Sequence, residues 1–131
     1  MKQEQVDPGW AWTKKFNITA GVKVGDNVHL SGLIALDSDG NLVGEGDVYA
    51  QSRKVFENIE EALASAGAGI ADVTKITTWL TDMSNYGGFA KARAEVFPNG
   101  VASTAVCSPA LALPGVLVEV EAIAVIGSGH A

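Results

Sequence analysis

Hydrophobic and polar positions alternate most regularly between residues 117 and 126. One side of an extended chain is wholly apolar there and consists of Val118, Val120, Ala122, Ala124 and Ile126. The other side carries Glu119 and Glu121, about 6.6 Å apart at ~3.3 Å per residue, flanked by Leu117, Ile123 and Val125. The pattern predicts a strand with one face in the core. Because its other face is apolar at both ends and acidic in the middle, we expect that face to be covered as well.

Weaker alternation comes earlier in the chain. Residues 16–24 and 28–36 are predicted strands, and the Gly-containing turn between them favours antiparallel pairing. Residues 1–15 contain Trp10 and Trp12 without a clean period. We interpret them as a surface arm whose aromatic pair docks against the domain or a partner chain, or packs over a core edge. Residues 127–131 are interpreted as a mobile tail.

Apolar residues repeat at intervals of three and four in two segments. Asp47 is the predicted N-cap of a first helix that runs to about Ala66, and Gly67 follows as its left-handed stop. The apolar stripe of this helix predicts that it covers a sheet. A second helix is capped by Ser84 or Asn85 and ends before residues 98–100. Its apolar positions are Phe89, Ala92, Val96 and Phe97.

Two further strands complete the pattern. Residues 73–80 are rich in Thr, Ile and Trp and are predicted to form one strand. Residues 102–108 precede a turn at Pro114 and Gly115, which predicts a hairpin or a crossed pair of strands with residues 117–126. The order is two strands, helix, strand, helix and two strands. It predicts an α+β sandwich with both helices on one face of a sheet.

Composition places these elements in one domain. With 131 residues and 47% hydrophobic content, the chain is expected to fold as a single domain over residues 1–131. Its net charge of -6 argues against nucleic-acid binding. Cys107 is the single cysteine, so no internal disulfide forms. Because no signal peptide or membrane span is recognisable, we expect a cytoplasmic protein with no membrane partner.

Residues that carry metal or cofactor chemistry are not grouped in the sequence. His29 and His130 are far apart, and no pair of Cys or His residues has metal-ligand spacing. The glycines do not form a phosphate loop, because Gly67 ends a helix and residues 87–88 fall in the first turn of another. No serine lies in a nucleophile elbow. The sequence therefore predicts neither a metal site nor a cofactor.

A larger pattern of residues extends over nearly the whole chain. It consists of Val28 to Gly32, Gln51, Asn58, Ile59, Leu63, Ala66, Gly67, Asp72, Val73, Lys75, Asp82 and residues 118–124. In this pattern the chain resembles the reactive intermediate deaminase family (RidA/YjgF). The resemblance implies a chorismate-mutase-like α+β fold and a homotrimer with three ligand clefts between neighbouring subunits. A neighbouring chain would then cover the mixed face of residues 117–125.

The resemblance also implies a chemistry. The best-studied members hydrolyse enamines and imines derived from amino acids, which requires an anchor for the substrate carboxylate and a group that delivers water. The anchor of those members is an arginine, and its place in this chain is taken by Ser103 or, in a register shifted by two, by Ala105. Neither side chain supplies a charge, so the bidentate part of carboxylate binding is lost.

Other cleft positions of the family match in part. Ser31 and Glu119 match family cleft residues, whereas the family tyrosine falls near Ile18 and the family asparagine falls at Ala90. Glu119, the candidate catalytic residue, either activates water or satisfies backbone donors or an intersubunit lysine. Ser31 either binds ligand or makes an ordinary strand-end hydrogen bond.

Three further residues are weighed in the same way. His29 could act as an acid or base, but a lone strand histidine is more often structural. Glu121 is interpreted as a solvated or interfacial charge. Cys107 is kept as a ligand-binding candidate, but it has no nearby cationic partner in the sequence, and a small buried hydrophobic residue is the favoured interpretation.

Arg93 is the more unusual of the two arginines. It stands four residues after Phe89 and three before Val96, so it projects from the apolar side of the second helix, whereas Arg53 lies on the polar flank of the first. We expect Arg93 to point toward the intersubunit cleft, where it pairs with a carboxylate such as Glu119 or anchors an anionic ligand. The alternative is an arginine that extends along the helix to solvent.

These observations lead to two functional hypotheses. The first is a trimeric hydrolase that acts on an enamine, an imine or a similarly activated metabolite, with Glu119 orienting water. The second is a trimer that binds a small ligand or a protein without turnover, because the family arginine is absent. The ribonuclease activity attributed to some relatives is disfavoured by the acidic balance of the chain.

Overall fold

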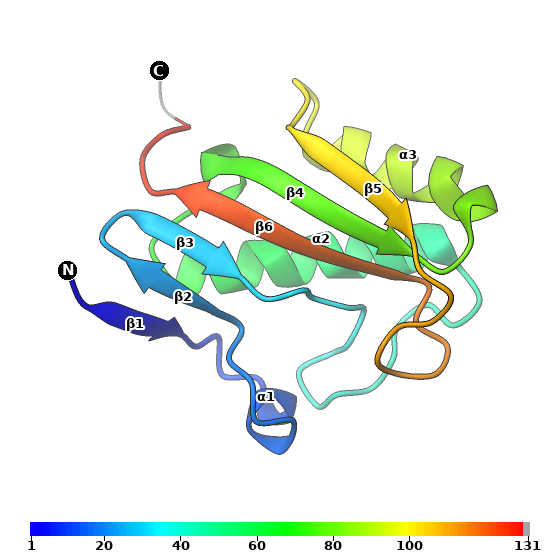
Figure 1. Cartoon of the computed structure of the whole chain (residues 1–131), viewed down its shortest axis with the longest axis horizontal. Coiled ribbons are helices and arrows are strands. Elements are labelled where there is room, and N and C mark those ends of the chain that lie inside the picture. Colours follow the sequence, from blue (N-terminus) through cyan, green and yellow to red (C-terminus); the bar gives the residue numbers. More distant parts are fainter. Residues whose placement is uncertain (130–131) are drawn as a thin grey trace.

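The strand β6 (Val118–Val125) lies in the middle of the sheet (Figure 1). The computed structural model describes residues 1–129, which form a six-stranded sheet in the order β1-β2-β3-β6-β4-β5. Neighbouring strands are antiparallel except β4 and β5, which are parallel and connected through helix α3. The remaining elements are β1 (Gln3–Val6), α1 (Ala11–Lys15), β2 (Gly21–Val24), β3 (Asn27–Leu30), α2 (Val48–Ser65), β4 (Val73–Leu80), α3 (Tyr86–Val96) and β5 (Ser103–Cys107).

Helices α2 and α3 lie on the same face of this sheet, behind it in Figure 1. The predicted α+β arrangement is therefore confirmed. On β6 the apolar side chains face the helices, and Val118, Val120, Ala122 and Ala124 are at most 1% exposed. Burial of this apolar side fixes the register of β6, because a slip by one residue would bring Glu119 and Glu121 into the core.

The opposite side of the sheet, here called the outer face, is covered by neither α2 nor α3. Strand alternation assigns to the outer face the side chains of Glu119, Glu121, Ile123 and Val125 on β6 and of Lys75, Thr77 and Trp79 on β4. All of these residues are half-buried in the isolated chain.

The predicted ends of α2 are confirmed. The Asp47 carboxylate accepts a hydrogen bond from the Ala50 N–H at 3.0 Å, and Gly67 adopts a φ of +86° after the last turn. Asn85 occupies the N-cap position of α3, as one of the two predicted residues, but its side chain makes no capping hydrogen bond. The side chain that caps this region is Asp82, which accepts from the Ser84 N–H at 2.9 Å and starts a 3₁₀ turn (Met83–Asn85) leading into α3.

The surface arm expected at residues 1–15 has regular structure, and its aromatic pair packs on the domain as expected. Residues 3–6 form β1, which pairs with the edge of β2, and residues 11–15 form α1. Trp10 and Trp12 stack with ring centroids 5.2 Å apart, and both are at most 5% exposed. Strand β2 is also shorter than predicted, because Asn17, at a φ of 54°, ends the α1 turn inside the predicted strand.

Three further predictions, on two strand segments and on the tail, are corrected as well. Strands β5 and β6 do not pair with each other, since β4 lies between them. The predicted strand 28–36 ends at Leu30 and continues as irregular chain with two isolated bridges, from Leu33 to Val120 and from Leu36 to Leu42. In the predicted tail, the Gly129 N–H donates to the Asp72 carboxylate at 3.0 Å, so residues 127–129 are tied to the body. Residues 130 and 131, including His130, lie outside the described residues.

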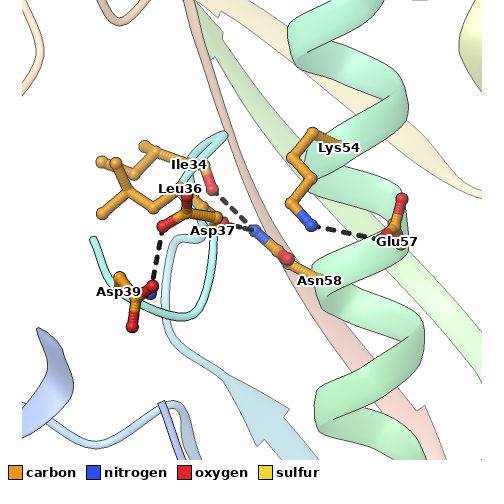
Figure 2. Close-up of polar contacts among 7 residues, drawn as sticks. All are labelled: Ile34, Leu36, Asp37, Asp39, Lys54, Glu57 and Asn58. Carbon is orange, nitrogen blue, oxygen red and sulfur yellow. Dashed lines mark hydrogen bonds and ion pairs between the residues drawn. The ribbon is translucent and has the colours of Figure 1, made fainter. Parts of the chain in front are cut away.

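Two buried amide side chains of α2 hold the irregular segments in place. Asn58 donates from Nδ2 to the carbonyls of Ile34 at 3.0 Å and Leu36 at 2.9 Å, as Figure 2 shows. Gln51 donates to the carbonyls of Gly44 and Gly115 and accepts from the Leu117 N–H at 2.9 Å. These amides replace the ladder partners that a strand would have supplied to the buried backbone.

We predict that Asn58→Ala lowers the free energy of unfolding by about 2 to 4 kcal/mol, because two buried carbonyls lose their donor. The control is Glu57→Ala, one residue earlier on α2. The Glu57 side chain is 68% exposed and pairs with Lys54 at the surface (Figure 2), so its loss costs about 0.5 kcal/mol or less. Urea unfolding at fixed protein concentration measures both, and equal midpoints would contradict the prediction.

Candidate functional site

A hollow of about 260 Å³ lies around the carboxylate of Glu119. Its walls come from three parts of the chain: α1 and the segment after it, the segment that follows β3, and the loop before β6. Apart from Glu119 and Gly32, the residues lining it are apolar, namely Trp12, Phe16, Ile18, Ile34, Leu36, Ala112 and Leu113. The hollow therefore presents a single ionisable group in an apolar setting.

The environment of Glu119 raises its pKa above the ordinary value. Partial burial among apolar groups is the larger cause, and repulsion from the carboxylate of Glu121 on the same face is the smaller. Gly32 lies directly against the Glu119 side chain, and a Cβ at Gly32 would overlap the carboxylate. The Glu119 carboxylate can therefore occupy this position only because Gly32 has no side chain.

The α2 amides fix two walls of this hollow from the other side of the sheet. Asn58 binds the backbone of Ile34 and Leu36, whose side chains line it. Gln51 binds Gly115 and Leu117, which follow the lining residue Leu113 in the loop before β6. The geometry around Glu119 is thus set by the fold.

The structure brings Ile18, but not Ser31 or His29, to the Glu119 hollow. Ile18 lies on its wall and is 46% exposed. The Ser31 hydroxyl donates to the Thr19 carbonyl at 2.7 Å, which is the strand-end hydrogen bond considered as its structural alternative. His29 is exposed on β3, opposite Ile123 of β6. Glu121 is half-buried on the outer face and does not line the hollow.

The candidates on β5 lie on the other face of the sheet. In the parallel register Ser103 pairs with Ile76 and Ala105 with Thr78, both of which point to the helices. Neither Ser103 nor Ala105 therefore shares a face with Glu119. The β5 residue that does is Thr104, and its hydroxyl accepts a hydrogen bond from Lys75 Nζ at 2.6 Å. Sequence reasoning did not find the Lys75–Thr104 pair.

Cys107 is exposed at the end of β5, so the favoured interpretation as a buried residue is wrong. Its thiol lies 3.8 Å from the Thr81 carbonyl. The edge position of β5 explains the exposure, because β4 is the one strand that flanks it.

Arg93 does project from the apolar side of α3, but it does not reach Glu119. Its Nη1 donates to the Ser103 hydroxyl at 3.1 Å and its Nη2 to the Tyr86 hydroxyl at 3.0 Å. Within one chain the sheet separates Arg93 from Glu119, and the predicted pairing in an intersubunit cleft stays a prediction. Arg53 is exposed, as predicted, and pairs with Glu95 at 3.6 Å.

Two other features of residues 1–129 bear on function. No group of three or more His, Cys, Asp or Glu side chains in this range is placed to hold a metal ion. Within the same range, no helix combines the length and hydrophobicity needed to cross a membrane.

Comparison with known proteins identifies the family. Residues 13–126 match the sequence pattern of the family described as endoribonuclease L-PSP. The chain belongs to this family. A RutC family protein of Pyrococcus abyssi is 31% identical to it over 103 residues, which cover 79% of this chain and 81% of the relative.

Solved structures of L-PSP relatives have the same fold. A member of the YjgF/YER057c/UK114 family from Mycobacterium tuberculosis, Rv2704, superposes with a TM-score of 0.81 at 30% identity, covering 95% of this chain and 100% of the other. YyfA of Yersinia pestis, a protein of the conserved Rid family, superposes with a TM-score of 0.84 at 26% identity, covering 95% of this chain and 100% of the other. The predicted resemblance to the RidA/YjgF family and its chorismate-mutase-like α+β fold are confirmed.

We predict that the raised pKa of Glu119 makes the protein less stable at neutral than at acidic pH, relative to Glu119→Gln. Below the ordinary pKa of 4.5 the carboxyl is protonated in both the folded and unfolded states. As pH rises through the raised pKa, the folded state must release a proton that it holds more tightly, so stability is lost. Urea unfolding from about pH 4 to pH 8 measures the difference. The prediction is contradicted if the free energies of unfolding of the two proteins differ by the same amount at every pH. The control is Glu57→Gln, at an exposed position.

Proposed function

We propose that this L-PSP family member is a small-molecule hydrolase of the Rid type, which hydrolyses an imine or enamine in the hollow at Glu119. The observation that carries the proposal is the single carboxylate, with a raised pKa, in an apolar hollow. A carboxylate whose pKa moves toward neutrality is suited to accept and return a proton at physiological pH. The proposed reaction needs no cofactor.

The reaction converts an imine and water into a carbonyl compound and ammonia. The Glu119 carboxylate takes a proton from water as the water oxygen bonds to the imine carbon, and it passes this proton to the imine nitrogen, which gives the neutral carbinolamine. The carboxylate then takes the hydroxyl proton of the carbinolamine and gives it to the nitrogen as the C–N bond breaks, so ammonia and the carbonyl compound leave and the carboxylate is restored. An enamine enters by protonation at carbon. Apolar walls exclude competing water and hold the organic part of the substrate.

The lining of the hollow favours an uncharged, apolar imine over one derived from an amino acid. Among the described residues no lysine or arginine lines the hollow. Trp79 on β4 pairs with Glu119 on β6. Lys75 of the same chain lies four positions from Trp79, which is about 13 Å along β4. A substrate carboxylate beside Glu119 would therefore be repelled without compensation.

We further propose that the protein is a homotrimer in the cytoplasm and that the outer face lies between subunits. Half-buried apolar residues such as Trp79 and Ile123 are interspersed there with Glu119 and Glu121. A sheet face of this mixed kind is suited to an interface that also contains a polar site. The exposed thiol of Cys107 suits a reducing compartment.

A trimer that binds a ligand without turnover is the second candidate, because the charged anchor of the best-studied deaminases has no counterpart in the hollow. RNA cleavage is not proposed, although the family description contains the word endoribonuclease. The net charge of -6 and the two carboxylates on the outer face repel a phosphate backbone.

We predict that the protein sediments as a trimer at micromolar concentration. The reason is that the outer face leaves apolar side chains uncovered in the isolated chain. Sedimentation velocity over a dilution series measures the mass. A monomer mass at every concentration would rule out the trimer and the intersubunit position of the site.

We predict faster hydrolysis of the imine that an amine oxidase makes from phenethylamine than of the one that an amino-acid oxidase makes from phenylalanine. The two substrates share an aromatic group and differ in the carboxylate, so a preference of about tenfold or more is expected. Trapping of the imine by semicarbazide, with and without the protein, measures the rates. Equal rates would contradict the proposed substrate class.

In the same assay Glu119→Gln is expected to lower the acceleration about 100-fold or more. Glu121→Gln, on the same strand and face, is the matched control. It should retain turnover with a pH profile shifted to lower pH, since one cause of the raised Glu119 pKa is removed. Binding of the substrate without turnover in the unmodified protein would favour the second candidate function.

A further inference from the structure

The carboxylate of Glu119 has no counter-ion within the chain. It is half-buried, and among residues 1–129 it makes neither a hydrogen bond nor an ion pair. The one charge that acts on it there is the carboxylate of Glu121, which repels it. A carboxylate that is partly removed from water and lacks a counter-ion attracts a cation more strongly than an exposed carboxylate does.

Two aromatic rings accompany this carboxylate in the lining of the hollow. They belong to Trp12 and Phe16, and their centroids are 6.4 Å apart with the ring planes at 55°. Trp10 stacks on Trp12, which is 5% exposed, so the Trp12 ring is held in place. The face of an aromatic ring attracts a cation, and tilted rings together with a carboxylate are suited to recognise an organic ammonium ion.

Two lysines on neighbouring elements do not line the hollow. Lys15 has its Nζ 5.9 Å from the ring centroid of Phe16, outside the lining. Lys75 lies about 13 Å along β4 from Trp79, the partner of Glu119. The other side chains in the lining are aliphatic and belong to Ile18, Ile34, Leu36, Ala112 and Leu113. They suit the apolar part of a ligand rather than a second charge.

We propose that the Glu119 hollow binds a primary ammonium ion that carries an aromatic or branched aliphatic group. The carboxylate accepts charge-assisted hydrogen bonds from the ammonium, the rings of Trp12 and Phe16 attract the cation, and the aliphatic wall packs against the apolar group. The inference rests on the proposed function, because the parent amine of an imine substrate has this chemistry. The amine and its imine compete for one hollow, so free amine slows the hydrolysis of its own imine.

Three probes of similar shape and different charge test this site on the full chain. Phenethylammonium is a cation, phenethyl alcohol is neutral and hydrocinnamate is an anion. Titrations into ¹⁵N-labelled protein follow the amide signals of Gly32 and Leu113 and the indole N–H signal of Trp12. We expect phenethylammonium to bind about tenfold or more tightly than phenethyl alcohol, and hydrocinnamate to leave these signals unchanged.

Two carboxylate variants separate a local site from the general attraction of an acidic protein for cations. Glu119→Gln should weaken phenethylammonium binding about tenfold or more and leave phenethyl alcohol unaffected. Glu121→Gln, on the same face of β6, should weaken it less than about threefold, because Glu121 does not line the hollow. Trp12→Leu should weaken it about threefold through loss of the ring. If Trp12→Leu does not fold, Phe16→Leu takes its place, because Phe16 is 42% exposed.

The proposal is overturned by any of three results. The first is that phenethylammonium shifts none of these signals up to about 10 mM. The second is that phenethyl alcohol or hydrocinnamate binds equally well, and the third is that Glu119→Gln and Glu121→Gln lose equal affinity.

Competition in the semicarbazide assay separates this inference from the proposed function. The competitor is cumylamine, an ammonium ion at neutral pH whose amine-bearing carbon has no hydrogen, so an amine oxidase cannot convert it into an imine. We expect cumylamine to raise the KM for the phenethylamine-derived imine and to leave kcat unchanged. Binding of phenethylammonium without imine turnover would rule out the proposed function and support this inference. Turnover that cumylamine does not inhibit, together with no binding of phenethylammonium, would rule out this inference alone.

Discussion

The burial of irregular backbone is the constraint on which the site depends. The segments after β3 and before β6 are not strands, yet several of their carbonyl and N–H groups are removed from water, and such groups need partners. Gln51 and Asn58 supply these partners from α2, and both side chains are at most 2% exposed. They are neutral amides, so they can be buried at lower cost than charged groups and can both donate and accept. One helix thereby shapes a hollow on the far side of the sheet.

Within one chain the sheet also separates two half-buried charged groups. Glu119 lies on the outer face, and Arg93 lies on the helix side beside Ser103. A salt bridge between them would neutralise both and leave little electrostatic affinity for a ligand. Because the sheet keeps them apart, each charge acts on its own surroundings. The carboxylate has a raised pKa in an apolar hollow, and the guanidinium is oriented by hydroxyls and rings.

Sequence periodicity predicts the long elements of this fold and the side of β6 on which Glu119 lies. Strong alternation over eight residues of β6, and the three-and-four repeat of α2, leave one choice of buried face. The short β1 and α1 escape prediction because a polar edge strand of four residues has no apolar side to repeat. The face of Ser103 could not be predicted either, since it depends on parallel pairing of β5 with β4, a contact between distant residues. The apolar side of α3 gave the direction of Arg93, but the helix alone does not reveal the sheet between it and Glu119.

The central position of β6 has a consequence for how the chain folds as it is synthesised. Strands β3 and β4 are joined in the sheet through β6, the last strand in the sequence. Until that strand leaves the ribosome, the two halves of the sheet have no common neighbour, and the apolar sides of α2 and β4 lack a large part of their cover. Domains of this kind cannot gain their main long-range contacts until the last strand of the sheet has been synthesised. The nascent chain is therefore expected to depend on chaperones that shield apolar surface until β6 emerges, and to fold cooperatively after that.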